Sequence, residues 1–342
     1  MNQHPAAHGT PGSIGAHESA DSDAGFDADF EVVVVGGGAA GLSAALVLGR
    51  GRRRVAVVDA GQPRNAPAAH MQGFLGSDGL PPADLLAKGR TEVVGYGVEL
   101  IAGSVEAIAA CPARPGNRGR FLLRLADGSR IRARRVLVTT GLRDDIPDIP
   151  GVRERWGRDL LHCPYCHGYE VADQPLGVLG DTPEAVAHAH LIRQWTNDVV
   201  LFTNGTILSA QQRELLAARA IGIVADPVVS LAVSEDRLVG VEIGDGQVVP
   251  RNAVFVRPEF VPNDTLLTDL GCATHPNGWV VVDATGATSV PGVWAAGNAV
   301  NPRAQVITAA GEGSAAAIAI NNDLVEEDLP IAVTNFRLGL PV

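Results

Sequence analysis

The feature that most constrains the fold is a run of valines that ends in a cluster of glycines. Residues 31–35 read Glu-Val-Val-Val-Val, which is typical of a buried parallel strand. The glycine-rich segment follows at once, and the next seven residues have the composition of a helix. Gly36 permits the tight turn, Gly38 lets backbone N–H groups approach a phosphate, and Gly41 lets the helix pack closely on the strand. This pattern predicts the start of a dinucleotide-binding βαβ unit.

The next strand supports this interpretation. Residues 54–58 are again rich in valine, and they end at Asp59, which lies 18 residues after Gly41. A carboxylate at this distance can accept hydrogen bonds from a ribose. The alternative is a glycine-rich turn that binds nothing. Strand, glycines, helix, second strand and acid all occur in register, so we favour a nucleotide site.

The same architecture recurs later in the chain. A strand at 176–179 leads through Gly180 to a helix expected from about 184 to 195, and a strand at 199–202 follows. Beyond residue 252 we expect strands at 254–256 and 279–283, and a small-residue helix over 305–321. The sequence therefore predicts an α/β protein with two Rossmann-like units.

Composition and charge exclude some classes of function. Lys and Arg number 27 against 38 Asp and Glu, which gives a net charge of −11 and argues against nucleic-acid binding. We find no signal peptide and no apolar run near the roughly 20 residues that span a bilayer, so we expect a soluble cytoplasmic protein with no membrane contact. Residues 1–28 lack periodicity and are expected to be a disordered tail.

The densest chemistry lies at Cys163 and Cys166, which are flanked by His162 and His167. We interpret the pair as a redox dithiol/disulfide. Half of a zinc site is the alternative, but a structural zinc needs a second ligand pair with matching spacing, and the sequence has none, so we predict no metal. Thiol exchange needs a proton acceptor that titrates near neutral pH, which either histidine can supply. The histidines could equally be polar residues beside a turn, and the sequence does not choose between the two as the acid/base.

Five motifs together resemble the low-molecular-weight thioredoxin reductase flavoproteins. They are the glycine cluster 36–41, Thr140-Gly141, the CxxC, the segment 295–298 and the segment 305–308. The resemblance implies two three-layer Rossmann-like domains (ββα/βαβ) of the class II pyridine nucleotide-disulfide oxidoreductase type, the second inserted in the first. Residues 29–148 and 253–342 would form the FAD-binding domain, and 149–252 an NADPH-domain-like module that carries the CxxC. It also implies a homodimer.

The resemblance further implies a set of FAD contacts. Those expected at the diphosphate are Gly36, Gly38, Ala39, Ala40 and Gly41. Asp59 would bind the adenosine ribose and Val105 would lie by the adenine, while Asn298 stands where the family usually has Asp beside the ribityl chain. Gln305 and Val306 would meet the pyrimidine edge of the flavin. The other cofactor contacts expected are Ala60, Arg64, Asn65, His70, Thr140, Gly141 and Gly297. In the family the second cysteine, here Cys166, lies closer to the flavin, and the first, here Cys163, exchanges with the substrate.

Two departures from the reductases redirect the functional prediction. The second glycine fingerprint reads Gly-Asp-Thr-Pro-Glu-Ala at 180–185, which brings negative charge toward a pyrophosphate, and no basic cluster follows residues 201–202. The segment Cys-Pro-Tyr-Cys-His-Gly-Tyr-Glu at 163–170 resembles FAD-dependent dithiol oxidases that close disulfides in secondary metabolites such as gliotoxin, holomycin and romidepsin. We therefore expect oxidation of a small-molecule dithiol with O₂ reduced to H₂O₂. The alternatives are an NAD(P)H-dependent thioredoxin or dithiol reductase and a non-catalytic flavin-binding redox sensor.

Overall fold

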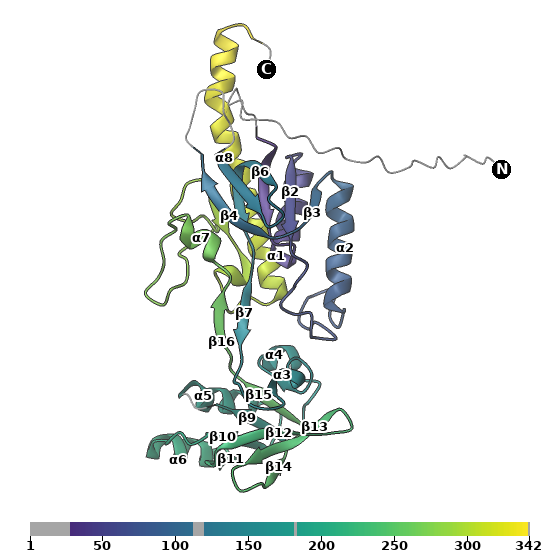
Figure 1. Ribbon diagram of the computed structural model, residues 1–342, viewed down its shortest axis with the longest axis vertical. Coiled ribbons are helices and arrows are strands. Elements are labelled where there is room, and N and C mark those ends of the chain that lie inside the picture. Colours follow the sequence, from purple (N-terminus) through teal and green to yellow (C-terminus); the bar gives the residue numbers. More distant parts are fainter. Residues whose placement is uncertain (1–27, 112–119, 181–182, 341–342) are drawn as a thin grey trace, which may run out of the picture.

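The computed structural model describes residues 28–111, 120–180 and 183–340. The tail predicted at 1–28 lies outside the described residues except for Ala28, whose side chain is buried. The chain forms two bodies stacked along the long axis of the molecule (Figure 1). The predicted α/β class with two Rossmann-like sheets is confirmed.

The first body is built on a seven-stranded sheet in the described residues. Its strand order is β3-β2-β1-β6-β5-β4, with β17 also paired to β6. The strands β1, β2, β3 and β17 run parallel to their neighbours, while β4, β5 and the start of β6 are antiparallel. The bounds are β1 Phe30–Val35, β2 Val55–Asp59, β3 Glu99–Ala102, β4 Val105–Ala110, β5 Phe121–Leu125, β6 Arg130–Val138 and β17 Val293–Ala295.

The alternating valines of β1 explain the three layers of this body. Val32 and Val34 pack in a core with the helices α1, α2 and α8 on one face of the sheet. Val33 and Val35 pack on the other face with side chains of β4, β5 and α7. Because both faces of a parallel sheet are covered, its strands read as unbroken apolar runs. The helices are α1 Ala39–Arg50, α2 Pro82–Gly95, α7 Thr265–Asp269 and α8 Val306–Arg337, with the 3₁₀ turn η1 at Gly297–Ala299.

The second body repeats the three layers around a five-stranded parallel sheet of order β11-β10-β9-β15-β8. Helices α5 and α6 cover one face, and the antiparallel strands β12, β13 and β14 cover the other. The bounds are α3 Val152–Arg155, β8 Leu160–Leu161, α4 Pro164–His167, β9 Leu176–Leu179, α5 Pro183–Ile192, β10 Val199–Phe202, α6 Ala210–Ala218, β11 Ile221–Val224, β12 Val228–Ser234, β13 Arg237–Ile243, β14 Val248–Pro250 and β15 Ala253–Val256.

Two antiparallel strands connect the bodies, as Figure 1 shows between them. They are β7, Leu142–Asp145, on the way out and β16, Glu259–Pro262, on the way back. The boundary predicted at 252/253 falls just before β15, which pairs with β9 in the sheet of the second body. We therefore propose that the inserted module ends after Val256, at the start of β16.

Two predicted elements differ from those observed. The strand expected at 279–283 is a loop with a single bridge between Thr274 and Val280, and it ends in a turn in which the N–H of Gly286 donates to the carbonyl oxygen of Asp283. The helix expected over 305–321 continues to Arg337 as α8. Beyond Asp328, most side chains of α8 are exposed. No helix in the described part of the chain is long and apolar enough to cross a membrane.

Candidate functional site at the junction of the two bodies

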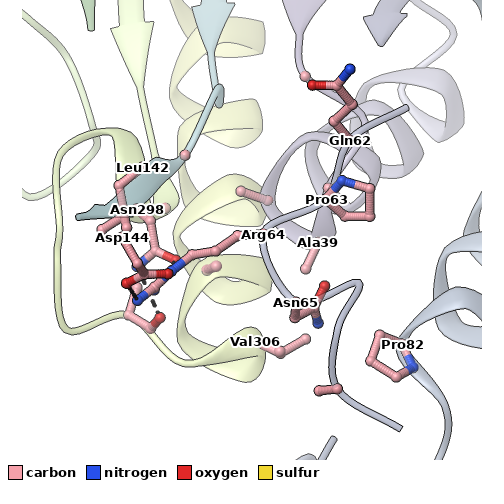
Figure 2. Close-up of a pocket in the computed structure, with 18 of the residues that line it drawn as sticks. Ala39, Gln62, Pro63, Arg64, Asn65, Pro82, Leu142, Asp144, Asn298 and Val306 are labelled. Atoms are coloured by element: carbon pink, nitrogen blue, oxygen red, sulfur yellow. Dashed lines mark hydrogen bonds and ion pairs between the residues drawn. The ribbon is translucent and has the colours of Figure 1, made fainter. Parts of the chain in front are cut away.

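A cavity of about 620 Å³ lies where the two bodies meet. Its walls come from the glycine turn after β1, the loop between β2 and α2, the start of α8 and the segment around α4. Figure 2 shows Arg64 on that loop, with its side chain directed at Asn298 and Asp144. The cavity therefore joins the predicted nucleotide site to the predicted redox pair in one continuous space.

Almost all of the residues predicted for the site line this cavity. Those that do are Gly36, Gly38, Ala39, Ala40, Asp59, Ala60, Arg64, Asn65, His70, Val105, Thr140, Gly141, His162, Cys163, Cys166, His167, Gly297, Asn298, Gln305 and Val306. Gly41 is the exception. A Cβ at this residue would lie 1.9 Å from the carbonyl oxygen of Gly36, so Gly41 serves the contact between α1 and β1 and does not face the cavity.

The start of α1 has the properties of a phosphate site. Gly38 is its N-cap, and no side chain caps the free N–H groups of the first turn. A Cβ added at Gly38 would meet no atom within 4 Å, so it would project into open space. Because uncapped N–H groups and the helix dipole attract anions, this end of α1 fits a pyrophosphate.

Asp59 lies at the end of β2, beside the glycine turn. Its carboxylate accepts a hydrogen bond from the backbone N–H of Gly37 at 3.1 Å and one from Arg90 at 3.3 Å. A side chain on Gly37 would clash with this carboxylate, since its Cβ would come within 2.7 Å. The turn thus brings the acid close to the phosphate site, as a ribose contact requires.

The start of α8 provides a second uncapped helix end. Gln305 is the N-cap, and its side chain makes no capping bond. Gly297 and Gly313 allow this helix and η1 to approach α1, since a Cβ at Gly313 would lie 2.0 Å from the carbonyl oxygen of Ala40. Two helix N-termini therefore converge on the cavity, which fits a ligand with negative charge at two places.

The redox pair forms the wall of the cavity on the side of the inserted body. Cys163 and Cys166 form a disulfide with a Cα–Cα distance of 5.3 Å, and Cys163 is the N-cap of the short helix α4. Both cysteines are half-buried. Cys111 and Cys272 are free thiols elsewhere in the described chain.

His162 is held inside an aromatic and charged cluster. Its ring stacks on Trp156 with centroids 5.7 Å apart and meets the ring of Phe260 edge-on at 6.0 Å. Burial, together with the nearby guanidinium of Arg64, lowers the pKa of His162 to about 4. At neutral pH this imidazole is therefore uncharged and a weak proton acceptor.

His167 differs from His162 in its surroundings. It ends α4, directly after Cys166, and its ring nitrogens have no hydrogen-bond partner among the described residues. Burial lowers its pKa, and the carboxylate of Glu170 acts in the opposite direction. His167 is thus neutral at pH 7 with both ring nitrogens available to exchange a proton.

Three residues of the site were not predicted from the sequence. Asp144 of β7 binds Arg64 through both carboxylate oxygens, at 2.7 and 2.5 Å. Trp156 and Phe260 enclose His162. Asp144 lies in no motif of the sequence. Neither aromatic residue lies in a motif, so the sequence carried no signal for them.

Comparisons with known proteins agree with this geometry. The family model of the pyridine nucleotide-disulphide oxidoreductases matches residues 30–313. Thioredoxin reductase sirT of Leptosphaeria maculans is 29% identical over 88% of this chain and 96% of its own length. A protein of Arthroderma benhamiae named "Probable thioredoxin reductase" is 34% identical over 52% of this chain, and the match spans 44% of that protein. The crystal structure of HlmI is 55% identical, covers 92% of this chain and 99% of its own, and superposes with a TM-score of 0.87.

Proposed function

We propose a function from one premise: the chain belongs to the pyridine nucleotide-disulphide oxidoreductase family. It is a thioredoxin reductase-like oxidoreductase, and FAD is its cofactor. Within that family we propose that it is an FAD-dependent dithiol oxidase, which closes a disulfide in a small-molecule dithiol and reduces O₂ to H₂O₂. The observation that carries the proposal is the single cavity that holds both the nucleotide features and the Cys163–Cys166 disulfide.

The residues of the cavity fit FAD. The uncapped start of α1 would hold the diphosphate, Asp59 the adenosine ribose, and the region of Asn298, Gln305 and Val306 the flavin end. Bound FAD supplies two-electron acceptor chemistry that restores the enzyme disulfide and, in an oxidase, delivers the electrons to O₂. The protein supplies the thiol exchange, for which it needs a disulfide and a proton acceptor.

The exchange can be written with the residues present. A substrate thiol gives its proton to His167, and the thiolate attacks Sγ of Cys163. A substrate–Cys163 disulfide forms, the Cys163–Cys166 bond breaks, and Cys166 leaves as a thiolate. The second substrate thiol then loses its proton and attacks the substrate sulfur of the mixed disulfide, and Cys163 leaves and takes up that proton as a thiol. The substrate is oxidised by two electrons, and the two enzyme cysteines are reduced.

Of the two histidines, we assign the acid/base role to His167. His162 has a pKa of about 4 and lies in contact with a guanidinium, so it cannot readily take up a proton near neutral pH. His167 adjoins Cys166 and has free ring nitrogens. A neutral imidazole in this place can accept the substrate proton and return it to a leaving thiolate.

The segment after β10 supports oxidase over reductase activity. Thr203 is almost fully buried, and the side-chain oxygen of Asn204 accepts a hydrogen bond from the backbone of Val228. Residues 203–206 contain no Lys or Arg. A reductase that reads the 2′-phosphate of NADPH needs cationic side chains near the end of this strand. The other half of the second fingerprint, residues 181 and 182, lies outside the described residues.

An NAD(P)H-dependent thioredoxin or dithiol reductase is the second candidate, because similar proteins are named thioredoxin reductases. Oxygen uptake separates the two functions. With dithiothreitol as the dithiol and no NADPH, we expect the purified yellow protein to consume O₂ and release an equal amount of H₂O₂. NADPH alone should cause no uptake. Uptake that needs NADPH, or none with any dithiol, would exclude the oxidase. The natural-product nature of the substrate, the homodimer and the cytoplasmic location stay predictions from the sequence.

A further inference from the structure

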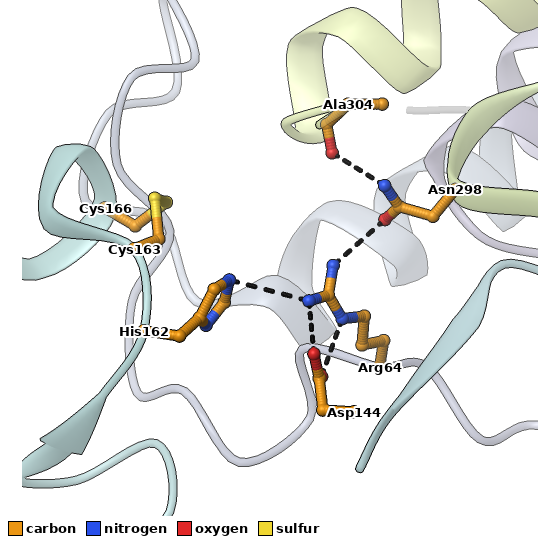
Figure 3. Close-up of a disulfide and its surroundings, with 7 residues drawn as sticks. All are labelled: Arg64, Asp144, His162, Cys163, Cys166, Asn298 and Ala304. Carbon is orange, nitrogen blue, oxygen red and sulfur yellow. Dashed lines mark hydrogen bonds and ion pairs between the residues drawn. A yellow bond between two sulfur atoms is a disulfide. The ribbon is translucent and has the colours of Figure 1, made fainter. Parts of the chain in front are cut away.

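Arg64 connects the parts of the molecule that meet at the site. It lies on the loop after β2, in the first body, and its Nε and Nη2 atoms bind both oxygens of Asp144 on the connecting strand β7. Its Nη2 also lies 3.5 Å from Nε2 of His162 in the inserted body, and its Nη1 lies 3.4 Å from Oδ1 of Asn298. Figure 3 shows the guanidinium at the centre of these contacts, with the disulfide on the far side of His162.

The chemistry of the guanidinium fixes the state of its partners. All five of its N–H groups are donors, and it offers no acceptor. Nε2 of His162 must therefore present its lone pair to Arg64, which leaves the proton of the neutral ring on Nδ1. A protonated His162 would instead direct an N–H group and a positive charge at the guanidinium. The same logic orients Asn298, whose Nδ2 donates to the carbonyl oxygens of Asn301 and Ala304.

We propose that Arg64 is a positioning residue that holds His162 as the neutral Nδ1–H tautomer and so keeps it out of proton transfer. His162 directly precedes Cys163, so this contact also ties the disulfide segment to the first body. The division of labour between the histidines rests on the function proposed above. The tautomer of His162 and its dependence on Arg64 do not rest on that function.

The groups around His162 are consistent with this role. Burial lowers its pKa, and the titratable groups that face it are Arg64, Asp144 of β7, His167 of α4 and His188 of α5. Of these only Asp144 favours protonation, and its carboxylate is engaged by Arg64. Trp156 and Phe260 present aromatic surfaces to the ring. Without the guanidinium, the unpaired carboxylate of Asp144 would draw a proton to His162.

The test is ¹⁵N NMR of the FAD-loaded protein with ¹⁵N-labelled histidine, with the His162 signals assigned from His162→Gln. In the wild type we expect a protonated Nδ1 and an unprotonated Nε2 that do not change between pH 8 and pH 5.5. In Arg64→Met we expect the pKa of His162 to rise by roughly one to two pH units, since a neighbouring charge has effects of this size. Arg64→Lys keeps the charge and loses the planar fork, so we expect a neutral ring with mixed tautomers.

Each result decides the proposal. A proton on Nε2 in the wild type, titration of wild-type His162 near pH 6.5, or unchanged His162 signals in Arg64→Met would each overturn it. The wild-type spectrum is sufficient on its own if the Met variant does not fold. Absence of oxidase activity would refute the proposed function and leave these spectra unaffected, so the two failures can be told apart.

Discussion

At the scale of single residues, the two cysteines differ in function, and so do the two histidines, although all four lie within six residues of sequence. All four line the cavity beside the cofactor features. Burial lowers the pKa of both imidazoles, but only His162 lies against a guanidinium. The surroundings, rather than the residue type, make His167 the proton acceptor in our account.

His167→Gln tests this assignment. We expect kcat/KM for dithiothreitol to fall on the order of 10²-fold, the usual contribution of a general base. In the wild type the rate should fall as pH drops through the pKa of His167, which lies below 6.5, because the protonated ring cannot accept a proton. The pH–rate profile of the variant should lack this fall in rate at acidic pH. If the rate of His167→Gln still fell at acidic pH as in the wild type, the titrating group would be another residue.

Cys166→Ser tests the sulfur chemistry. We expect complete loss of anaerobic bleaching of the flavin band by dithiothreitol, because no disulfide remains to accept the thiolate. Cys111→Ser is the matched control, since Cys111 is a free and half-buried thiol away from the cavity. Full bleaching in Cys166→Ser would mean that the dithiol reduces the flavin directly.

At the scale of elements, the turn between β1 and α1 combines a binding role and a packing role in neighbouring glycines. A Cβ at Gly38 would enter open space in the cavity, whereas a Cβ at Gly41 would overlap the carbonyl oxygen of Gly36. The motif predicted a packing role for Gly41, whereas the resemblance to the reductases placed both glycines at the diphosphate. The structure separates them.

Two variants make that separation measurable. Gly38→Val should fold with a near-normal apo melting temperature, since Gly38 has an extended backbone that any residue can adopt, but it should bind FAD weakly. Gly41→Ala should cost about 1–3 kcal/mol of unfolding free energy, as overpacked cores do. Differential scanning fluorimetry and flavin content report both. Normal flavin content in Gly38→Val would place the diphosphate elsewhere.

Elements with strong local signals could be predicted from the sequence, and those shaped by distant contacts could not. The valine strands, the glycine turn and the second βαβ unit were recognised because burial on both faces leaves continuous apolar runs. The strand expected at 279–283 did not form, although Val280 and Val282 pack against the core of the first body; Val280 forms a single bridge, to Thr274. The Asp144–Arg64 pair joins residues 80 apart in the chain, and no local pattern reports such a contact.

At the scale of the whole molecule, buried neutral histidines make stability depend on pH. Burial lowers the pKa of His162 and of His188 to about 4, from 6.5. A histidine whose pKa is lower in the folded state takes up a proton more readily when unfolded. Stability contributed by the neutral rings is therefore complete above pH 6.5 and is lost as pH falls from about 6.5 to 4.

We expect the urea midpoint to fall steadily between pH 7 and pH 4.5. The loss approaches a limit on the order of 3 kcal/mol per histidine, which is the free-energy equivalent of the change in pKa. His188→Gln should flatten this slope, whatever its effect on stability at pH 7. An identical slope in wild type and variant would contradict the assigned pKa of His188.

The most direct test of the central claim is an anaerobic titration of the FAD-loaded protein, followed by absorbance of the oxidised flavin. We predict that NADPH leaves the band unchanged. Two successive equivalents of a dithiol, each counted per enzyme disulfide, should together bleach it. Air should then restore the band with release of H₂O₂. Bleaching by NADPH, or a band that no dithiol diminishes, would contradict the account.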